Sequence, residues 1–282
     1  MAAPRTLALA AAAALTSIAG CGGARGPKIT LRYRPPTGTA YHYALEQANS
    51  WMVRGGGRGA LQGSDLTLHL YFTQAVTGPV AGGLGATVIY DSATMVPTGY
   101  APALDRMRGL ASAVVYDDRG QVVSAHFTAL SGAPSPIADK LAQSVLETAL
   151  PLPERAVGVG DSWTAEDAPL GATLGVSVKA RLRCTVQEIR RGAADTTVRI
   201  TVERTFLGDP VTVTELSPAG VPERRVVRVA GKFTGERLLS VATSLPVRAT
   251  LGGLMTIDVS APGGVEETTI SRQFTLQLLG AK

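Results

Sequence analysis

Apolar and polar side chains alternate along most of this chain, and this period of two constrains the fold more than any other feature of the sequence. Every even position from Leu66 to Phe72 is apolar, and so is every even position from Val198 to Val202. Successive side chains of a β-strand point to opposite faces, so the pattern is typical of half-buried strands. It predicts strands in these two stretches and in residues 29–34, 41–54, 86–95, 176–186, 211–215, 225–230, 235–242, 254–260 and 268–279.

Short turn sequences separate the predicted strands. Asp117-Asp118-Arg119-Gly120 lies between two apolar stretches and predicts a hairpin, and Pro262-Gly263-Gly264 predicts a second one. Turns this short join antiparallel strands, whereas parallel strands need a long crossover. With 45% hydrophobic residues to form a core, the chain is predicted to be mainly β, a large curved antiparallel sheet or half-barrel.

One segment breaks the alternation. In residues 135–150, Ile137, Leu141 and Val145 fall on one stripe of a helix, and a serine and a proline at its start suit the first helical turn. A Leu-Pro-Leu-Pro run ends it. We expect an inserted amphipathic helix that packs on the concave face of the sheet, and a weaker helix at residues 101–108.

The N-terminus has the features of an export signal. Arg5 gives a positive leader, residues 7–15 form an apolar core too short to cross a bilayer, and small residues lead to Cys21. Ile18-Ala19-Gly20-Cys21 resembles the lipobox of bacterial lipoproteins. A buried free cysteine after an alanine-rich helix is the alternative interpretation.

The lipobox resemblance implies how the chain is processed and where it resides. In that family the signal is removed before the cysteine, which here would release residues 1–20 and leave Cys21 carrying a diacylglyceryl group and an acylated amino terminus. Two or more acyl chains give stable attachment to a membrane. Gly22, in place of an aspartate, favours the outer membrane, facing the periplasm; in a host with one membrane, the outer face of that membrane is the equivalent.

The mature chain is predicted to be a tether at residues 21–28 followed by a single β-rich domain at residues 29–282. Gly38-Thr39-Ala40-Tyr41 resembles Gly160-Asp161-Ser162-Trp163, which suggests two half-repeats at residues 29–150 and 157–282. Coincidence in a chain rich in Val, Thr and Gly is the alternative.

Two resemblances go beyond the lipobox. The junction at residues 153–163 resembles one that recurs in uncharacterised secreted bacterial lipoproteins. The strand pattern is loosely similar to the Lol-type lipoprotein carriers and related lipid-carrier lipoproteins, which implies a half-barrel closed by helices over an apolar cavity. This chain departs from that pattern in its small helical content.

Charge and cysteine content exclude several classes of function. The net charge of +5 is dispersed, without the clustered basic stripe of a nucleic-acid-binding protein. If Cys21 is lipidated, Cys184 is left alone and no intramolecular disulfide can form. Cys184 falls on the apolar side of its predicted strand, so we expect a buried thiol.

Known catalytic and metal-binding motifs are absent from the sequence, and we predict no catalytic residue, cofactor or metal. The glycine cluster at residues 55–59 lacks the lysine of a phosphate loop and is interpreted as a hairpin tip. The histidines His42, His69 and His126 are far apart and fall on the polar sides of their strands. Adjacent acidic pairs, Asp117-Asp118 and Glu266-Glu267, cannot flank a substrate as an acid and a base.

The tryptophans Trp51 and Trp163 are interpreted as core residues rather than as binding anchors. The favoured function is a non-enzymatic, lipid-anchored envelope protein, monomeric on its tether, that binds an apolar ligand or a lipidated partner in the concave face of its sheet. The alternative is a structural lipoprotein that docks another envelope component. A hydrolase with an unrecognised site is the remote alternative.

Overall fold

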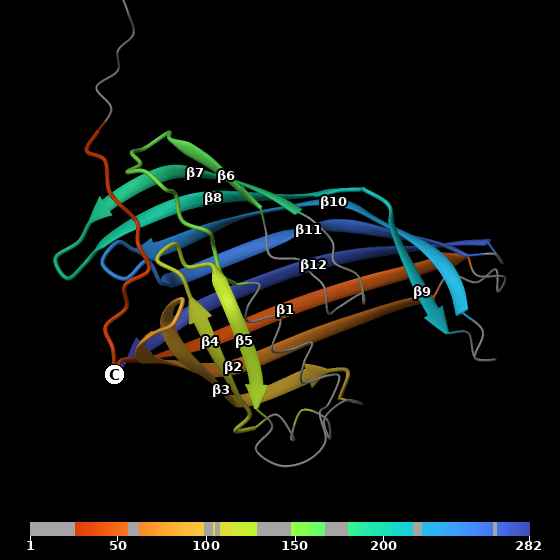
Figure 1. Ribbon diagram of the computed structural model, residues 1–282, viewed down its shortest axis with the longest axis horizontal. Helices are drawn as coiled ribbons and strands as arrows, with labels where there is room; N and C mark the ends of the chain where they lie inside the picture. Colours follow the sequence, from red (N-terminus) through yellow and green to blue (C-terminus); the bar gives the residue numbers. More distant parts are fainter. Residues whose placement is uncertain are drawn as a thin grey trace, which may run out of the picture.

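The computed structural model describes residues 26–55, 62–98, 104, 108–128, 148–166, 180–216, 222–261 and 264–282. These residues form one twelve-stranded sheet (Figure 1). The first five strands are β1 (Ala40–Gly55), β2 (Gln62–Val80), β3 (Gly83–Val96), β4 (Ala111–Tyr116) and β5 (Val122–Thr128). The remaining seven are β6 (Ser162–Glu166), β7 (Ala180–Arg191), β8 (Thr196–Leu207), β9 (Val211–Leu216), β10 (Pro222–Ser240), β11 (Pro246–Ala261) and β12 (Gly264–Ala281).

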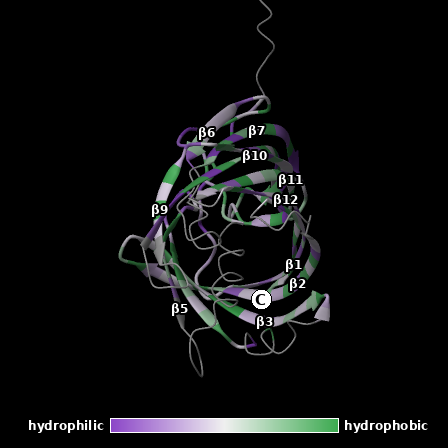
Figure 2. Ribbon diagram, turned by 90° about the vertical axis from the view of Figure 1, so that its right-hand side faces the viewer, coloured by the Kyte–Doolittle hydropathy of each residue, from purple (hydrophilic) through white to green (hydrophobic). Residues whose placement is uncertain are grey.

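All strand pairs are antiparallel, in the order β5-β4-β3-β2-β1-β12-β11-β10-β8-β7-β6, and β9 pairs with β10 outside this path. The first and last strands, β1 and β12, pair along almost their whole length and join the two halves of the sheet. Viewed end-on in Figure 2, the sheet is a strongly curved arc. It does not close, since β5 and β6 remain at its edges. The predicted fold class, a large curved antiparallel sheet, is confirmed.

The predicted hairpin at residues 117–120 is confirmed and joins β4 to β5. The side-chain Oδ1 of Asp117 accepts the backbone N–H groups of Arg119, at 2.9 Å, and of Gln121, at 2.8 Å. Gly120 has a φ of 71°, a conformation that favours glycine. The turn residues therefore form the structure that their chemistry predicts.

Two strand predictions differ from the structure. Residues 29–34 form no strand, because they cross one end of the sheet and make only an isolated bridge between Ile29 and Val157. The strands predicted at residues 225–230 and 235–242 are one continuous strand, β10. Gly231, with a φ of 154°, lies between them, and the ladder passes through it without a register shift.

The helix predicted at residues 135–150 lies almost wholly outside the described residues, and Thr148 to Leu150 are not helical. The helix predicted at residues 101–108 lies outside them apart from Leu104 and Arg108. Residues 56–61, within which most of the glycine cluster falls, are also outside. In the parts of the chain that the structure describes, no helix is long and apolar enough to span a membrane.

Candidate ligand-binding face

The concave face of the sheet carries the apolar side chains of the alternating strands. Register places inward-facing residues opposite one another across neighbouring strands, as with Tyr43 opposite Phe72 and Leu45 opposite Leu70. The rings of Tyr43 and Phe72 stack with centroids 5.2 Å apart. Leu70 and Ile200, on opposite halves of the sheet, are both completely buried. The same face therefore continues across the whole sheet as the hydrophobic core.

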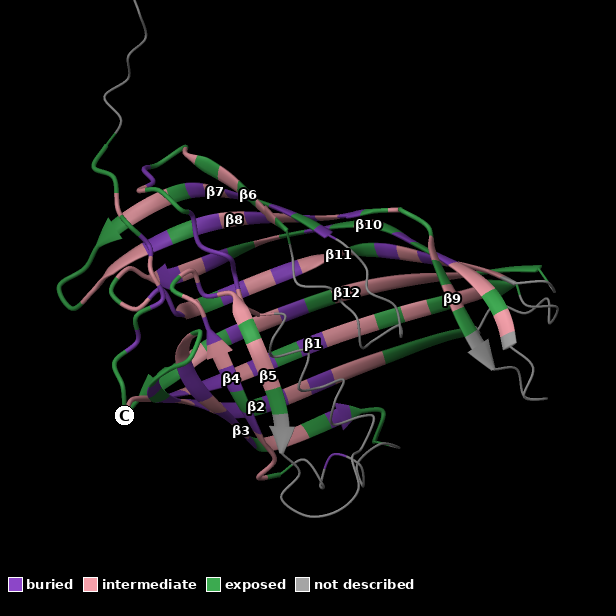
Figure 3. Ribbon diagram, in the orientation of Figure 1, coloured by how far each residue is buried: buried purple, intermediate pink, exposed green. Residues whose placement is uncertain are grey.

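We call the end of this face where β1 begins and β12 ends the closed end. Two segments without regular structure, residues 29–34 and 148–157, cover it, and we call them the plug. Tyr33 of the plug packs on Tyr116 of β4 with ring centroids 4.8 Å apart. Gln74 of β2 donates a hydrogen bond to the Tyr33 hydroxyl at 2.7 Å. Buried residues are frequent towards this end of the strands in Figure 3.

Hydrogen bonds join the two parts of the plug. Arg32 donates to the carbonyl oxygens of Pro153, at 2.9 Å, and Glu154, at 2.8 Å. The backbone N–H of Leu152 donates to the Arg119 carbonyl in the β4–β5 turn at 2.8 Å. Leu150 and Leu152 of this segment are buried. Buried backbone N–H and C=O groups need hydrogen-bond partners, and these bonds supply them for part of the segment.

Burial keeps the phenols of the closed end neutral. It raises the pKa of Tyr33, Tyr43 and Tyr116 well above the ordinary value of 10, with smaller contributions from neighbouring tyrosines. It also raises the pKa of Tyr90 to about 12, against a lowering effect of its bond to Ser112. These four phenols therefore stay protonated near neutral pH.

The cavity at the closed end is small. It has a volume of about 40 Å³ and is lined by residues of the plug and the sheet, Tyr43, Phe72 and Leu276 among them. Ligand pockets for molecules of drug size have volumes of roughly 300–1,000 Å³. The closed end is therefore packed and serves as core.

We call the opposite end of the face, where β1 ends and β12 begins, the open end. Here the inward residues of β1, β2 and β12 become half-buried: Trp51 lies opposite Ile270 on β12, and Leu66 lies on β2. On β10 and β11, by contrast, Val229 and Ile257 remain buried. The open end thus presents a strip of partly exposed apolar side chains along β1, β2 and β12.

A cluster of three polar side chains lies between the two ends, at the middle of β1 and β12. Arg272 donates through Nε to the Asn49 Oδ1 at 3.0 Å, and Gln47 donates to the same oxygen at 3.2 Å. Gln47 is buried, and the other two residues are half-buried. Polar groups at inward positions lose hydration unless they are hydrogen-bonded. These three residues therefore form a bonded cluster inside an otherwise apolar face.

Two further arginines lie on the concave face and are almost completely buried, Arg204 with 4% exposure and Arg237 with 3%. Arg237 donates to the Thr148 carbonyl of the plug, and its guanidinium lies 6.0 Å from the centroid of the Phe274 ring. Arg204 lies opposite Phe233 in the ladder. Such positions are unusual for arginine, because fully buried charged side chains are rare unless paired.

Inward glycines bring the backbones of β10 and β11 close together. A Cβ built on Gly235 would lie 1.9 Å from the Thr250 carbonyl oxygen, and one built on Gly253 would lie 2.1 Å from that of Lys232. Only glycine permits the two backbones to approach this closely. Glycine kinks of this kind bend a sheet, and they leave inward positions of β10 and β11 without a side chain.

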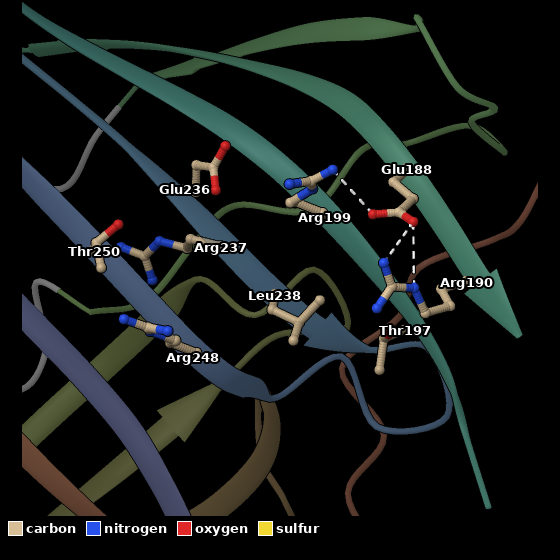
Figure 4. Close-up of a pocket in the computed structure, with 9 residues that line it drawn as sticks. All are labelled: Glu188, Arg190, Thr197, Arg199, Glu236, Arg237, Leu238, Arg248 and Thr250. Carbon is tan, nitrogen blue, oxygen red and sulfur yellow. Dashed lines mark hydrogen bonds and ion pairs between the residues drawn. The ribbon is translucent and has the colours of Figure 1, made fainter. Parts of the chain in front are cut away.

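Two larger hollows are lined mainly by polar and charged side chains, and the first of them lies on the convex face. One, of about 370 Å³, crosses β7, β8, β10 and β11 (Figure 4), where Glu188 pairs with Arg190 at 2.9 Å and with Arg199 at 3.0 Å. The other, of about 1,000 Å³, lies between the plug and β6–β8 and includes Lys28, paired with Asp161 at 3.3 Å. Their size suits a ligand, but their charged surface is that of a solvated face.

The convex face also carries the histidines. His42 Nδ1 lies 2.9 Å from the Thr73 hydroxyl, and that hydroxyl donates to the Asp91 Oδ2 at 2.8 Å. In a hydrolase triad the histidine lies between the nucleophile and the acid and takes the nucleophile's proton. Here the threonine is the central residue and gives its proton to Asp91, so His42 cannot activate it.

The other histidines do not join this row. His69 Nδ1 lies 3.7 Å from the Glu46 Oε2, and His126 is exposed on β5. Within the described parts of the chain, no group of three or more His, Cys, Asp or Glu residues could hold a metal ion. The histidines thus lie on the polar face, as the alternation predicts.

Other residues singled out in the sequence have defined places. Cys184 is completely buried, as predicted. Trp163 packs against the core and donates its indole N–H to the Pro151 carbonyl at 2.9 Å, whereas Trp51 lies half-buried at the open end. Cys21 lies outside the described residues.

The inward arginines were not identified from the sequence, although a signal for them was present. Arg204 stands between Val202 and Phe206 and occupies a position that the alternation reserves for apolar residues. Arg272 does the same between Ile270 and Phe274. An arginine at a position that the alternation predicts to be apolar is therefore expected to face the core.

No protein-family model matches the chain, and no curated protein matches its sequence. Among solved structures, it is similar to one that describes lipid–protein interactions in lipovitellin, with a TM-score of 0.54 and 12% sequence identity. The match covers 88% of this chain and 26% of the lipovitellin chain, so this chain spans about a quarter of that protein's length. At this identity the likeness is one of fold.

Proposed function

We propose that this chain is a lipid-anchored, non-enzymatic envelope protein that binds or carries an apolar ligand or a lipidated partner on the concave face of its sheet. The observation that carries the proposal is the half-buried apolar strip of the open end, which includes Trp51, Leu66 and Ile270. Apolar surface that a protein leaves partly exposed within a curved face is typical of a site for an apolar ligand.

Three further features support the proposal. The lipobox-like sequence ending at Cys21 would place the protein at a membrane, on the exported side, where lipids and lipidated proteins are available. The fold is similar to that of lipovitellin, whose solved structure concerns lipid–protein interactions. The row from His42 through Thr73 to Asp91 lacks the order of a catalytic triad.

The packed cavity of about 40 Å³ restricts where the ligand can bind. A single acyl chain does not fit at the closed end without displacing the plug. The ligand site is therefore assigned to the open end, along β1, β2 and β12, rather than to the tyrosine-rich core.

The test is mass spectrometry of organic extracts from the full chain carrying Cys21→Ser, purified from its own host under mild conditions. We expect a stoichiometric apolar molecule in the extract. Ile270→Asp, which introduces a charge into the strip, should abolish its recovery, whereas Thr269→Asp on the opposite face of β12 should not. If the Cys21→Ser protein with an unaltered concave face were empty, ligand carriage would be contradicted.

The anchor has a separate test. Cys21→Ser should abolish incorporation of labelled palmitate by the wild-type export pathway, because the thiol is the acceptor of the diacylglyceryl group. Continued labelling would show that the lipobox interpretation is wrong, whatever the concave face binds.

A second candidate function, the docking of another envelope component, is favoured by the edges of the sheet. β5 and β6 each pair with one neighbour only in the described sheet, and unpaired strand edges accept further strands. Co-purification of one stoichiometric protein with an otherwise empty chain, and its loss when a proline replaces Ala125 in β5, would support docking.

A further inference from the structure

The N-terminal segment joins the folded domain beside the turn that precedes β6. A Cβ built on Gly158 of this turn would lie 3.5 Å from the Gly26 carbonyl oxygen. The Lys28 Nζ lies 3.3 Å from the Asp161 Oδ2 at the other side of the turn. These contacts fix the place where the chain that leads back to Cys21 leaves the domain.

The turn itself presents an apolar side chain to solvent. The Asp161 N–H donates to the Gly158 carbonyl at 3.0 Å, and the Asp161 Oδ2 accepts from the Gly158 N–H at 3.0 Å. Gly160 has a φ of 85°, a conformation that glycine adopts readily. Val159, between the two glycines, is 54% exposed. The hydrogen bonds therefore hold the turn in a form that leaves Val159 at its exposed tip.

Exposed cations lie next to this turn. Arg155 of the plug and Arg181 and Arg183 of β7 are exposed, as is Lys28. All four line the hollow of about 1,000 Å³ between the plug and β6–β8. We call these four residues, together with Val159, the basic surface. It combines cations with one apolar side chain.

The basic surface lies within reach of a lipid on Cys21. Gly26 follows Cys21 by five positions, and an extended chain advances at most about 3.6 Å per residue. The lipid would therefore lie within about 18 Å of Gly26. Arg183 is opposite Thr164 of β6, which follows Asp161 by three residues, or about 10 Å of strand. A membrane that held the lipid would come close to the same side of the domain.

The carboxylates that line the hollow each have a cation beside them. The three ion pairs are Glu154 with Arg119 at 3.0 Å, Asp161 with Lys28 at 3.3 Å, and Glu203 with Lys232 at 2.7 Å. The ladder also places Glu166 opposite Arg181 and Glu203 opposite Arg183. In the part of the chain that the structure describes, no ion pair uses Arg155, Arg181 or Arg183.

The charge around the hollow is positive among the described residues. Five cations and three carboxylates line it, and adding the neighbouring Lys232 and Glu166 leaves the same excess of two. The cations of the basic surface are exposed rather than enclosed. They therefore suit a broad anionic surface better than a small anion, which needs donors that converge on one point.

We propose that the basic surface contacts the headgroups of anionic phospholipids in the membrane to which Cys21 anchors the chain. The inference rests on the proposed function, because it uses the anchor. Guanidinium groups present paired N–H donors that match phosphate oxygens in geometry. Each basic residue near an anionic lipid surface strengthens attachment to it. An apolar side chain among cations, such as Val159, suits the boundary between headgroups and acyl chains.

The experiment measures partitioning of the full chain carrying Cys21→Ser onto sedimented vesicles, so that no lipid anchor contributes. Vesicles of phosphatidylcholine alone are compared with vesicles that also contain phosphatidylglycerol. We expect at least about tenfold stronger partitioning onto the anionic vesicles, since each basic residue near such a surface contributes about fivefold. This binding should be lost in roughly 1 M salt, where the Debye length is about 3 Å.

Two double variants test the position of the contact. Arg181→Gln with Arg183→Gln removes two cations of the basic surface and should lower partitioning about twentyfold. Arg54→Gln with Arg224→Gln removes two exposed arginines near the open end. That end is far from the tether, because β12 alone has 18 residues and is about 60 Å long. The control should change little. Equal losses would indicate a general attraction of a basic protein and would overturn the proposal.

A second matched pair leaves the arginines in place. Val159→Asp puts a negative charge at the exposed tip of the turn and should lower partitioning about tenfold. Val265→Asp makes the same change near the open end, where Val265 is 58% exposed, and should have little effect. Neither side chain belongs to the core, so both variants should fold, which circular dichroism checks. Equal partitioning of the two would overturn the contact at the turn.

The outcomes separate this proposal from the proposed function. Ile270→Asp, which should lose the apolar ligand, should bind anionic vesicles as the unaltered chain does. Loss of vesicle binding in Ile270→Asp would move the contact to the open end and overturn the basic surface. Equal partitioning of the unaltered chain onto both kinds of vesicle would overturn the membrane contact and leave the ligand site untouched. Absence of palmitate labelling at Cys21 would instead contradict the anchor, on which the vesicle assay does not depend.

Discussion

The closed and open ends of the concave face are made from the same strands but differ in what covers them. At the closed end, Tyr33 and Leu152 of the plug lie on the sheet, and the tyrosines beneath are buried. At the open end, Trp51 and Ile270 of the same strand pair remain half-buried. The alternation of apolar and polar residues therefore determines which side chains face the concave side. Whether those side chains are fully buried depends on which other chain segments cover that side.

The difference between the ends predicts different roles for equivalent apolar residues. The closed end should contribute most of the stability, and the open end should contribute most of the binding. Four substitutions test this division, each with a control of the same chemistry.

The largest effect on stability is expected from Leu70→Ala at the closed end. Leu70 is completely buried, so its truncation leaves a cavity and should lower the free energy of unfolding by about 3 kcal/mol. Ile270→Ala at the open end should cost about 1 kcal/mol, because its side chain is only half-buried. Urea unfolding of both variants measures the difference. Equal losses would show that the two ends are packed alike.

The next effect is expected where β10 and β11 approach closely. Gly253→Ala should destabilise by about 2 kcal/mol, because its Cβ would overlap the Lys232 carbonyl and the backbone must shift. Gly280→Ala is the control, since nothing lies within 4 Å of a Cβ built there. Thermal unfolding by circular dichroism compares them. If Gly253→Ala proved as stable as the control, the bend would not depend on glycine.

The plug can be loosened by Arg32→Met. This removes the two bonds to the Pro153 and Glu154 carbonyls and should cost about 1.5 kcal/mol. Arg34→Met, at an exposed position two residues on, should have little effect. Hydrogen exchange should show faster exchange at Leu152 in the first variant and an unchanged open end. Faster exchange at both ends would mean that the plug and the open end unfold as one unit.

The smallest effect at neutral pH is expected from Tyr43→Phe. The Tyr43 hydroxyl is buried and has no hydrogen-bond partner among the described residues, so its removal should be neutral or stabilise by up to about 1 kcal/mol.

The effect of Tyr43→Phe should grow in alkaline solution. Burial raises the pKa of Tyr43 above 10, so above pH 10 the unfolded chain loses a proton that the folded chain keeps. Stability is therefore full below pH 10 and falls as pH rises towards the folded pKa. Urea unfolding between pH 9 and 11 should show a shallower loss for Tyr43→Phe than for Tyr71→Phe, an exposed tyrosine. Parallel losses would contradict the role of burial.

The strands were accessible to prediction because their signal is local. A period of two in residues such as Leu66 to Phe72 needs no knowledge of the rest of the chain, and the turn at Asp117 forms from bonds within five residues. The strand predicted at residues 29–34 failed for the opposite reason. Its alternation is real, but Leu31 and Tyr33 are buried by crossing the sheet rather than by pairing within it.

The candidate site was less accessible because it depends on distant segments. Arg272 and Asn49 are 223 residues apart and meet only because β12 pairs with β1. Arg204 lies in the same row of the sheet, which reaches it across β11 and β10. No sequence window contains this row, although each arginine stands out at an apolar position of its own strand.

Local physical chemistry was thus sufficient for the β class, the antiparallel connections and the inward position of Cys184. These follow from side-chain periodicity and turn residues, which are properties of neighbouring residues. The strand order, the plug, the bend at Gly253 and the placement of arginines within the concave face were decided by tertiary structure. They depend on which distant strands pair and on which segments cover the curved sheet. The contacts that stabilise these arrangements join residues that are far apart in the sequence.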